Sequence, residues 1–206
     1  MNANRIFWIK RLLPAALLLL GTGSTGLAAT TNVTCAIVQF YEYYPDEVRL
    51  DANRLEAYIR TAAANGAKLI VTPENCLHRY GPWLQNEVTQ LQLAEYFGEM
   101  VAKFSALAAE LNVCLVIGLR EPSGLEKPTY QSAVFIRNDG VLLKTYRKRW
   151  PSSAEYAYTR SGGDDYTPFD TPFGKVWMQI CRDMDGNDYT THMPTGIALM
   201  IGLSKD

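Results

Sequence analysis

Short apolar runs alternate with helical patterns in the first half of this 206-residue sequence. Residues 33–40 and 69–71 are apolar and rich in β-branched side chains, which is typical of buried strands. Between them, residues 48–64 place apolar side chains at nearly helical spacing, which predicts an amphipathic helix that Gly66 ends. Residues 91–111 predict a second, longer helix in the same way.

The pattern changes in the second half of the chain. Residues 113–119 form a continuous apolar run, as expected of a strand that is buried on both faces. Two hairpins and one more buried strand are predicted after it, over 130–137 with 141–146, over 169–171 with 175–180, and over 197–203. Strands and helices in alternation, followed by hairpins, predict an α/β layered domain with a mixed sheet.

The start of the chain differs in composition from the rest. Three basic residues precede an apolar stretch over 12–20, and small residues follow it up to Ala29. This order is typical of a secretory signal peptide, and the apolar stretch is shorter than the roughly 20 residues that cross a bilayer. We therefore predict a signal over 1–29, a domain over 33–206, and a periplasmic or secreted protein with no stable membrane span after cleavage.

Charge and cysteine content narrow the classes of function. The formal net charge is −1, which gives no electrostatic reason to predict a nucleic-acid partner. Four cysteines are too few for a disulfide framework in a chain of this length. Cys35 and Cys114 lie in predicted strands, and the sequence leaves open whether they form a disulfide. No paired Cys or His spacing typical of a metal site occurs.

Three predicted strands end close to a side chain that can carry chemistry, namely Glu74, Lys148 and Cys181. Such strand ends are where α/β domains collect their sites. Amide hydrolysis by a thiol needs a nucleophile, a base and a group that stabilises the oxyanion, and Cys, Glu and Lys supply all three. His78 and His192 are poorly placed for a papain-like Cys–His pair, in which the nucleophile lies far upstream of its histidine.

The residues around these three side chains resemble a known family. The runs GAKLIVTPE (66–74), DGVLLKTYRK (139–148) and TPFGKVWMQICRD (171–183) are similar to the three signature blocks of the nitrilase, or carbon–nitrogen hydrolase, superfamily. They also occur in the order and at the separations that the superfamily shows. One block alone would be weak evidence, whereas the three together are specific. The resemblance covers residues 33–206.

The resemblance implies a four-layer α-β-β-α sandwich, no metal or organic cofactor, and hydrolysis of a small amide or nitrile through a cysteine thioester. By position, Glu74 becomes the general base, Lys148 the oxyanion stabiliser and Cys181 the nucleophile. The backbone N–H of Arg182 follows the nucleophile and becomes the second oxyanion donor. Glu155 is the candidate for a second glutamate that orients the lysine in many relatives. A neighbouring ammonium is expected to favour the thiolate of the nucleophile.

Two features depart from the family pattern. Arg182 stands where relatives usually have an aromatic or small residue, and the chain ends at Asp206, where the superfamily domain normally continues through further strands and helices. From this we expect the domain to lack its C-terminal portion. Cys76, two residues after Glu74, is the rival of Cys181 as the reactive thiol.

Several functions stay open beside hydrolysis. The first alternative is a catalytically inactive remnant of the nitrilase fold, or a binding protein, which the expected truncation favours. Acyl transfer is a third reading, although related exported transferases carry several membrane spans. The resemblance also extends to the secreted vanin and biotinidase branch, without choosing a substrate. Relatives often pair through helices near the nucleophile, so a homodimer is a further possibility that the sequence does not decide.

Overall fold

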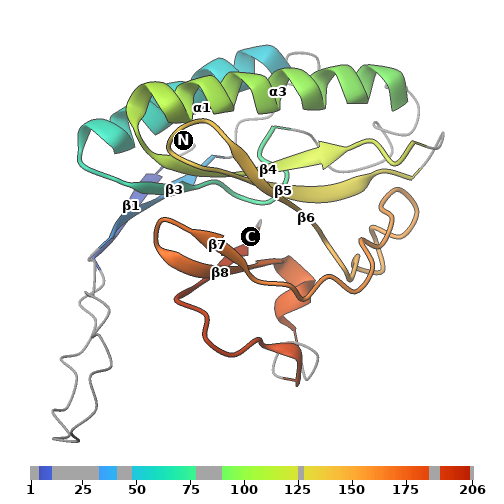
Figure 1. The fold of residues 1–206 in the computed structure, drawn as a ribbon. Coiled ribbons are helices and arrows are strands. Elements are labelled where there is room, and N and C mark those ends of the chain that lie inside the picture. The colour runs from blue at the N-terminus through green and yellow to red at the C-terminus, as the bar shows by residue number, and fades with distance from the viewer. Residues whose placement is uncertain are drawn as a thin grey trace, which may run out of the picture.

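A computed structural model describes six stretches of the chain (Figure 1), residues 5–10, 33–40, 48–77, 90–124, 128–185 and 191–204. Two helices, α1 Val48–Ala64 and α3 Gln90–Leu111, lie on one side of a six-stranded sheet. In spatial order that sheet consists of β1 Arg5–Lys10, β2 Thr34–Gln39, β3 Leu69–Val71, β4 Cys114–Glu121, β5 Tyr130–Ile136 and β6 Leu142–Arg147. A second sheet consists of β7 Phe169–Thr171, β8 Gly174–Ile180 and β9 Leu199–Leu203.

The six-stranded sheet is mixed, as the sequence predicts. The strands β2, β3 and β4 are parallel and are connected through α1 and α3, whereas β5 and β6 continue the sheet as antiparallel hairpin neighbours. In the smaller sheet, β8 pairs antiparallel with β7 and parallel with β9. A short 3₁₀ turn, η1 Cys181–Met184, follows β8 directly. Each predicted helix and strand between residues 33 and 203 is confirmed to within about two residues, the usual uncertainty of element boundaries.

The first core lies between the helices and the large sheet. Along β4, Leu115, Ile117 and Leu119 point toward α1 and α3, where they join buried side chains such as Leu55 and Phe104. Successive side chains of a strand point to opposite faces, so the other face of β4 faces a different layer. This explains why the sequence of β4 is apolar at consecutive positions rather than alternating.

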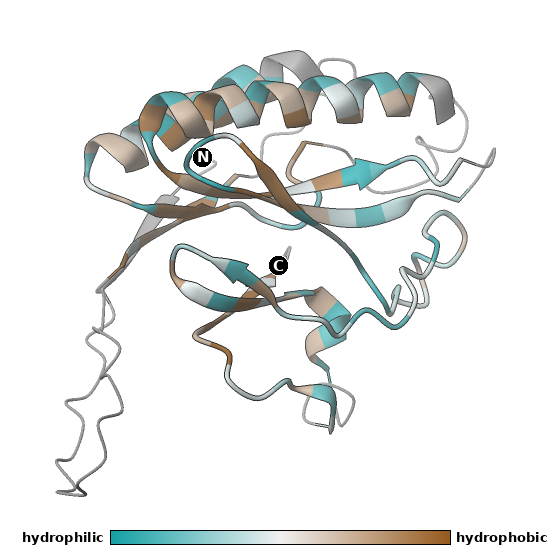
Figure 2. Ribbon diagram, in the orientation of Figure 1, coloured by the Kyte–Doolittle hydropathy of each residue, from teal (hydrophilic) through white to brown (hydrophobic). Residues whose placement is uncertain are grey.

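The second core lies between the two sheets. Cys114 and Val116, on the opposite face of β4, pack into a cluster with Val176, Met178 and Ile180 of β8. Figure 1 shows the smaller sheet beneath the larger one, and Figure 2 shows hydrophobic residues along the central strands while the end of β6 turns hydrophilic. The described layers therefore run helix, sheet, sheet, which are three of the four layers that the sequence predicts.

The strand β1 lies in the segment that the sequence predicts to be a signal peptide. Its backbone pairs antiparallel with β2, from Arg5 opposite Gln39 to Lys10 opposite Thr34. Residues 11–32 lie outside the described residues, so the signal over 1–29 stays a prediction. Among the helices that the structure describes, none combines the length and the apolar character that a membrane crossing requires.

The disulfide that the sequence leaves open does not form. Cys35 of β2 and Cys114 of β4 are both paired in register with Leu69 of β3, which lies between them. Two strand spacings separate their Cα atoms by about 9.5 Å, whereas a disulfide needs less than about 7 Å. Both thiols are free and pack among apolar side chains of the second core.

We expect the purified protein, unfolded without reductant, to contain four titratable thiols. The reason is that β3 holds Cys35 and Cys114 apart, even if the protein passes through an oxidising compartment. Titration with a chromogenic disulfide, together with the intact mass before and after reduction, measures this. A mass that rises by two hydrogens on reduction, with two thiols missing from the titration, would contradict the strand order.

Candidate active site

Glu74 lies on a turn that follows β3 and rests directly on β4. The backbone N–H of Cys76 donates to the carbonyl oxygen of Gly118 at 3.2 Å, and the Gly118 N–H donates to the Thr72 hydroxyl at 3.0 Å. A Cβ atom at Gly118 would stand 2.2 Å from the carbonyl oxygen of Pro73 and 3.1 Å from the Cα of Glu74. Only glycine permits this close approach, which fixes Glu74 above the middle of β4.

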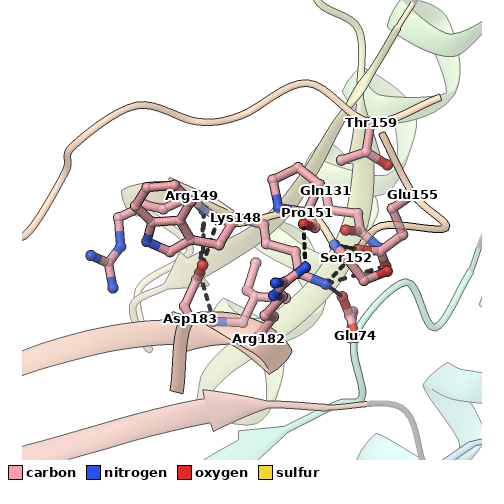
Figure 3. Close-up of polar contacts among 12 residues, drawn as sticks. Glu74, Gln131, Lys148, Arg149, Pro151, Ser152, Glu155, Thr159, Arg182 and Asp183 are labelled. Atoms are coloured by element: carbon pink, nitrogen blue, oxygen red, sulfur yellow. Dashed lines mark hydrogen bonds and ion pairs between the residues drawn. The ribbon is translucent and has the colours of Figure 1, made fainter. Parts of the chain in front are cut away.

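Lys148 follows the end of β6, and its side chain is completely buried, with 0% exposure. Its backbone N–H donates to the carbonyl oxygen of Gln131 on β5 at 2.8 Å, so the chain continues along β5 past the end of β6. The ammonium donates to Oε1 of Glu74 at 2.8 Å and to both carboxylate oxygens of Glu155, at 2.9 and 3.2 Å (Figure 3). The three side chains therefore form one buried cluster.

Glu155, the sequence candidate for a second glutamate, contacts the Lys148 ammonium and is itself held by further hydrogen bonds. Its Oε1 accepts a hydrogen bond from the Gln131 side chain at 3.0 Å, and its Oε2 accepts one from the Ser152 backbone N–H at 2.6 Å. The segment that carries it is tied to the start of β5 by the pairing of Thr129 with Thr159. Gln131 was not anticipated, because a single glutamine on a buried strand carries no sequence signal.

Cys181 follows β8 and begins η1 with a backbone φ of 48°. Non-glycine residues rarely adopt this left-handed conformation, and when they do it is often at functional sites. The thiol is half-buried, and the backbone N–H of Arg182, the predicted second oxyanion donor, acts to lower its pKa. The Arg182 guanidinium itself contacts the carbonyl oxygen of Pro151 at 3.4 Å.

The charges of the cluster do not cancel. Two carboxylates surround one ammonium, and burying even a paired charge is costly, so the arrangement is poor evidence for a role in stability. Burial by itself lowers the pKa of Lys148, but Glu74 and Glu155 outweigh it and hold the pKa above its ordinary value. Lys148 is therefore a permanent cation. Buried charges arranged around a thiol are typical of a catalytic site.

The same charges act on the Cys181 thiol. Burial and the negative charge of Glu74 raise the pKa of this thiol, and Lys148, which lowers it, does not compensate. Lys148 thus favours the thiolate, as expected, but burial and Glu74 outweigh its effect on the pKa. The nucleophile rests as a thiol, and a base must accept its proton during attack.

Asp183 is a further buried residue that the sequence analysis did not identify as part of the site. It lies in η1, two residues after Cys181, with 0% exposure. Its carboxylate accepts hydrogen bonds from the Tyr146 hydroxyl and from the backbone N–H groups of Arg149, Trp150 and Ile180. The available signal in the sequence was an acidic residue in the first turn after the nucleophile.

The remaining candidates have other contacts or lie outside the described residues. Burial raises the pKa of the Cys76 thiol to about 12, and its sulfur donates to the Thr72 hydroxyl at 3.3 Å. His192 stacks on Tyr166 with ring centroids 4.2 Å apart, and His78 lies outside the described residues. Within the described part of the chain, no group of three His, Cys, Asp or Glu side chains could hold a metal ion.

Comparison with known proteins gives a consistent result. The sequence model of the family described as "Carbon-nitrogen hydrolase" matches residues 34–201. Nitrilase 1 of Arabidopsis thaliana is 30% identical over 176 residues, which cover 78% of this chain and 50% of the relative. Omega-amidase NIT2 of Homo sapiens is 31% identical over 142 residues, which cover 65% of this chain and 50% of the relative.

A solved structure shares the fold. The carbon-nitrogen hydrolase from Helicobacter pylori G27 superposes with a TM-score of 0.71 at 25% identity, covering 84% of this chain and 59% of that chain. Three sequence blocks, a buried charge cluster and a half-buried thiol thus occur on a fold similar to that hydrolase. The chain spans about half the length of the curated relatives it matches.

In the folded protein, we expect Cys181 to be alkylated by iodoacetamide at least about tenfold faster than Cys76, because Cys181 is half-buried whereas Cys76 is fully buried and has a strongly raised pKa. The rate at Cys181 should rise with pH as the thiol ionises. Peptide mapping after short exposures measures both sites, and Cys181→Ala is the control that should remove the fast phase. Faster labelling of Cys76 would contradict this placement of the two thiols.

Proposed function

Because the chain belongs to the carbon–nitrogen hydrolase family, we propose that it hydrolyses a non-peptide carbon–nitrogen bond, in an amide first of all, through a thioester on Cys181. The observation that carries the proposal is the ammonium of Lys148, held at 2.8 Å from Glu74 and 2.9 Å from Glu155 with almost no exposure to solvent. Such a cluster beside a thiol supplies a proton acceptor and an oxyanion partner together.

Acylation needs one proton acceptor. The Cys181 sulfur attacks the amide carbon while Glu74 takes the thiol proton, which the raised pKa of the thiol makes necessary. The oxyanion that forms is stabilised by the Lys148 ammonium and by the backbone N–H of Arg182. Glu74 then gives its proton to the leaving amine, the carbon–nitrogen bond breaks, and the acyl group remains on sulfur as a thioester.

Deacylation uses the same groups with water as the attacking nucleophile. Water attacks the thioester carbon and gives its proton to Glu74, so one carboxylate serves both half-reactions. The carbon–sulfur bond breaks, the sulfur recovers the proton, and the acid product leaves. Glu155 is not required to move a proton in this scheme. Its two contacts with the ammonium orient Lys148 and leave Glu74 to accept and release the proton.

The buried cluster favours a hydrolase over an inactive remnant of the fold. Replacing buried charges by apolar side chains of similar size is often neutral or stabilising, so a remnant without selection for chemistry would gain nothing from keeping them. The acyl and amine groups of the substrate are not specified by these contacts. A nitrile or an acceptor amine would be handled by the same thiol, and product analysis distinguishes the three reactions.

The mechanism predicts which replacements abolish turnover. Cys181→Ala removes the nucleophile and should leave no turnover of any amide. Lys148→Met should lower kcat by a factor on the order of 10² or more, as expected for the loss of one oxyanion-stabilising group. Glu74→Gln should be equally damaging and should slow hydrolysis of a preformed thioester as well. Ammonia release from a panel of small amides, with burst-phase kinetics for the thioester, measures these effects.

His192→Ala is the matched control for this series, because the scheme gives histidine no proton to carry. We expect its kcat to stay within a few-fold of the unmodified protein. A His192→Ala protein as inactive as Cys181→Ala, together with a Glu74→Gln protein that keeps its rate, would refute the assignment of roles. An unmodified chain that binds amides but never releases ammonia would favour the binding-protein alternative.

We also propose that the protein is exported and that its signal is cleaved near Ala29. The basic start and the apolar stretch over 12–20 support this. Cleavage would remove β1 and leave β2 at the edge of the sheet. An exported and cleaved protein would therefore lack the pairing between β1 and β2.

Amino-terminal sequencing of the protein recovered from the periplasm or medium tests the proposal. We expect a start at or next to Thr30, because the small residues before it form the cleavage zone. The protein that remains inside the cells serves as the control and should begin at Met1. An exported protein that still begins at Met1 would refute cleavage.

A further inference from the structure

The nucleophile and the lysine come from different sheets, so something must hold the two sheets in register at the site. Lys148 extends from the end of β6 in the large sheet, whereas Cys181 follows β8 in the small one. Apolar packing between sheets is tolerant of small shifts, and an oxyanion donor misplaced by about 1 Å loses much of its effect. Hydrogen bonds next to both residues would prevent such shifts, because they depend on direction as well as distance.

The carboxylate of Asp183 makes such a contact with each side. Its Oδ1 accepts from the backbone N–H of Arg149 at 3.1 Å and of Trp150 at 2.8 Å, the two residues that follow Lys148 (Figure 3). Its Oδ2 accepts from the backbone N–H of Ile180 at 3.2 Å, the residue that precedes Cys181. One carboxylate thus joins the backbone beside the ammonium to the backbone beside the thiol.

Two further observations show that the carboxylate is built into this position. The Tyr146 hydroxyl, two residues before Lys148, donates to Oδ2 at 2.7 Å and itself accepts from Nε of Arg149 at 3.1 Å. The bond from Ile180 also closes the turn around Cys181, whose left-handed backbone needs support from its surroundings. All four donors are neutral groups that cannot follow the carboxylate by rotating a long side chain.

We propose that Asp183 is a positioning residue for the reaction proposed above, a clamp that fixes the Lys148 ammonium relative to the Cys181 thiol across the two sheets. Oδ1 accepts from the lysine side alone, whereas Oδ2 accepts from Ile180 on the cysteine side and also from Tyr146 and Arg149 on the lysine side. An asparagine has only one acceptor oxygen, and its amide group would face N–H donors. Asp183→Asn therefore loses the hydrogen bonds at one of the two oxygens and loosens the link between the two sides.

The test uses a readout that a purely structural role would not change. In folded Asp183→Asn protein, the pH profile of Cys181 alkylation by iodoacetamide should move to higher pH, because Lys148 no longer lowers the pKa of the thiol from a fixed place. At neutral pH the rate should fall roughly tenfold, the change in thiolate population that a pKa change of about 1 produces. In the amidase assay, kcat should fall about 10²-fold with little change in KM.

Two control variants separate positioning from general stability. Val176→Ala opens a cavity in the core between the sheets, so it should lower Tm without moving the alkylation profile. Tyr146→Phe removes only the hydroxyl donor and keeps all three backbone hydrogen bonds, so its profile should move less than that of Asp183→Asn. A folded Asp183→Asn protein with the profile of Val176→Ala would overturn the proposal.

If Asp183→Asn does not fold, Asp183→Glu decides the question. It keeps both acceptor oxygens but adds a methylene, so the two sides of the site must move apart and Cys181 should again react more slowly. An unchanged profile in this variant would overturn the clamp. Alkylation of Cys181 needs no substrate, so a moved profile in a protein without amide turnover would uphold the clamp and refute only the proposed hydrolysis.

Discussion

The ammonium of Lys148, fully enclosed in the protein, is the constraint that organises this structure. A buried cation is tolerated only where carboxylates and further hydrogen bonds replace water, and here Glu74 and Glu155 provide them. Glu74 lies 74 residues before Lys148 in the sequence, whereas Glu155 lies seven residues after it, so the fold must bring two remote chain segments to one point. Much of the irregular structure beyond the strands serves this convergence.

Two features of the backbone bring Glu74 and Lys148 closer together than the strand order alone would place them. The strands β3 and β6 are separated by β4 and β5, yet each sends its charged residue toward the middle. The turn with Glu74 rests on β4 because Gly118 has no side chain there, and Lys148 is hydrogen-bonded to β5 through Gln131. The base and the ammonium therefore lie above neighbouring strands, which allows direct contact at 2.8 Å.

The small sheet contributes Cys181, and the surroundings of this thiol determine how the proposed reaction begins. Because burial and Glu74 raise the pKa of Cys181, the resting site holds a thiol near a permanent cation and a proton acceptor. The thiolate then forms only as the proton moves, next to the group that stabilises the developing oxyanion. A second carboxylate, Glu155, keeps the lysine in place without having to accept that proton.

The sequence by itself determined the elements and the candidate residues. Apolar periodicity gave the bounds of strands such as β4 and of helices such as α1, since burial of one or both faces leaves a direct pattern in the chain. Local blocks also singled out Glu74, Lys148 and Cys181, because each follows a predicted strand. These features depend on neighbours in the sequence, so they can be read before the chain is folded.

Only the tertiary structure decided how these residues act on one another. Whether Cys35 meets Cys114 depends on which strand lies between them, and the pKa of Cys181 depends on burial and on charges from distant segments. The contacts of Asp183 also run to residues more than thirty positions away, along β6 and the loop after it. Hydrogen bonds, burial and electrostatic interactions between remote segments leave no periodic trace in a single sequence, because they exist only once the two sheets have packed together.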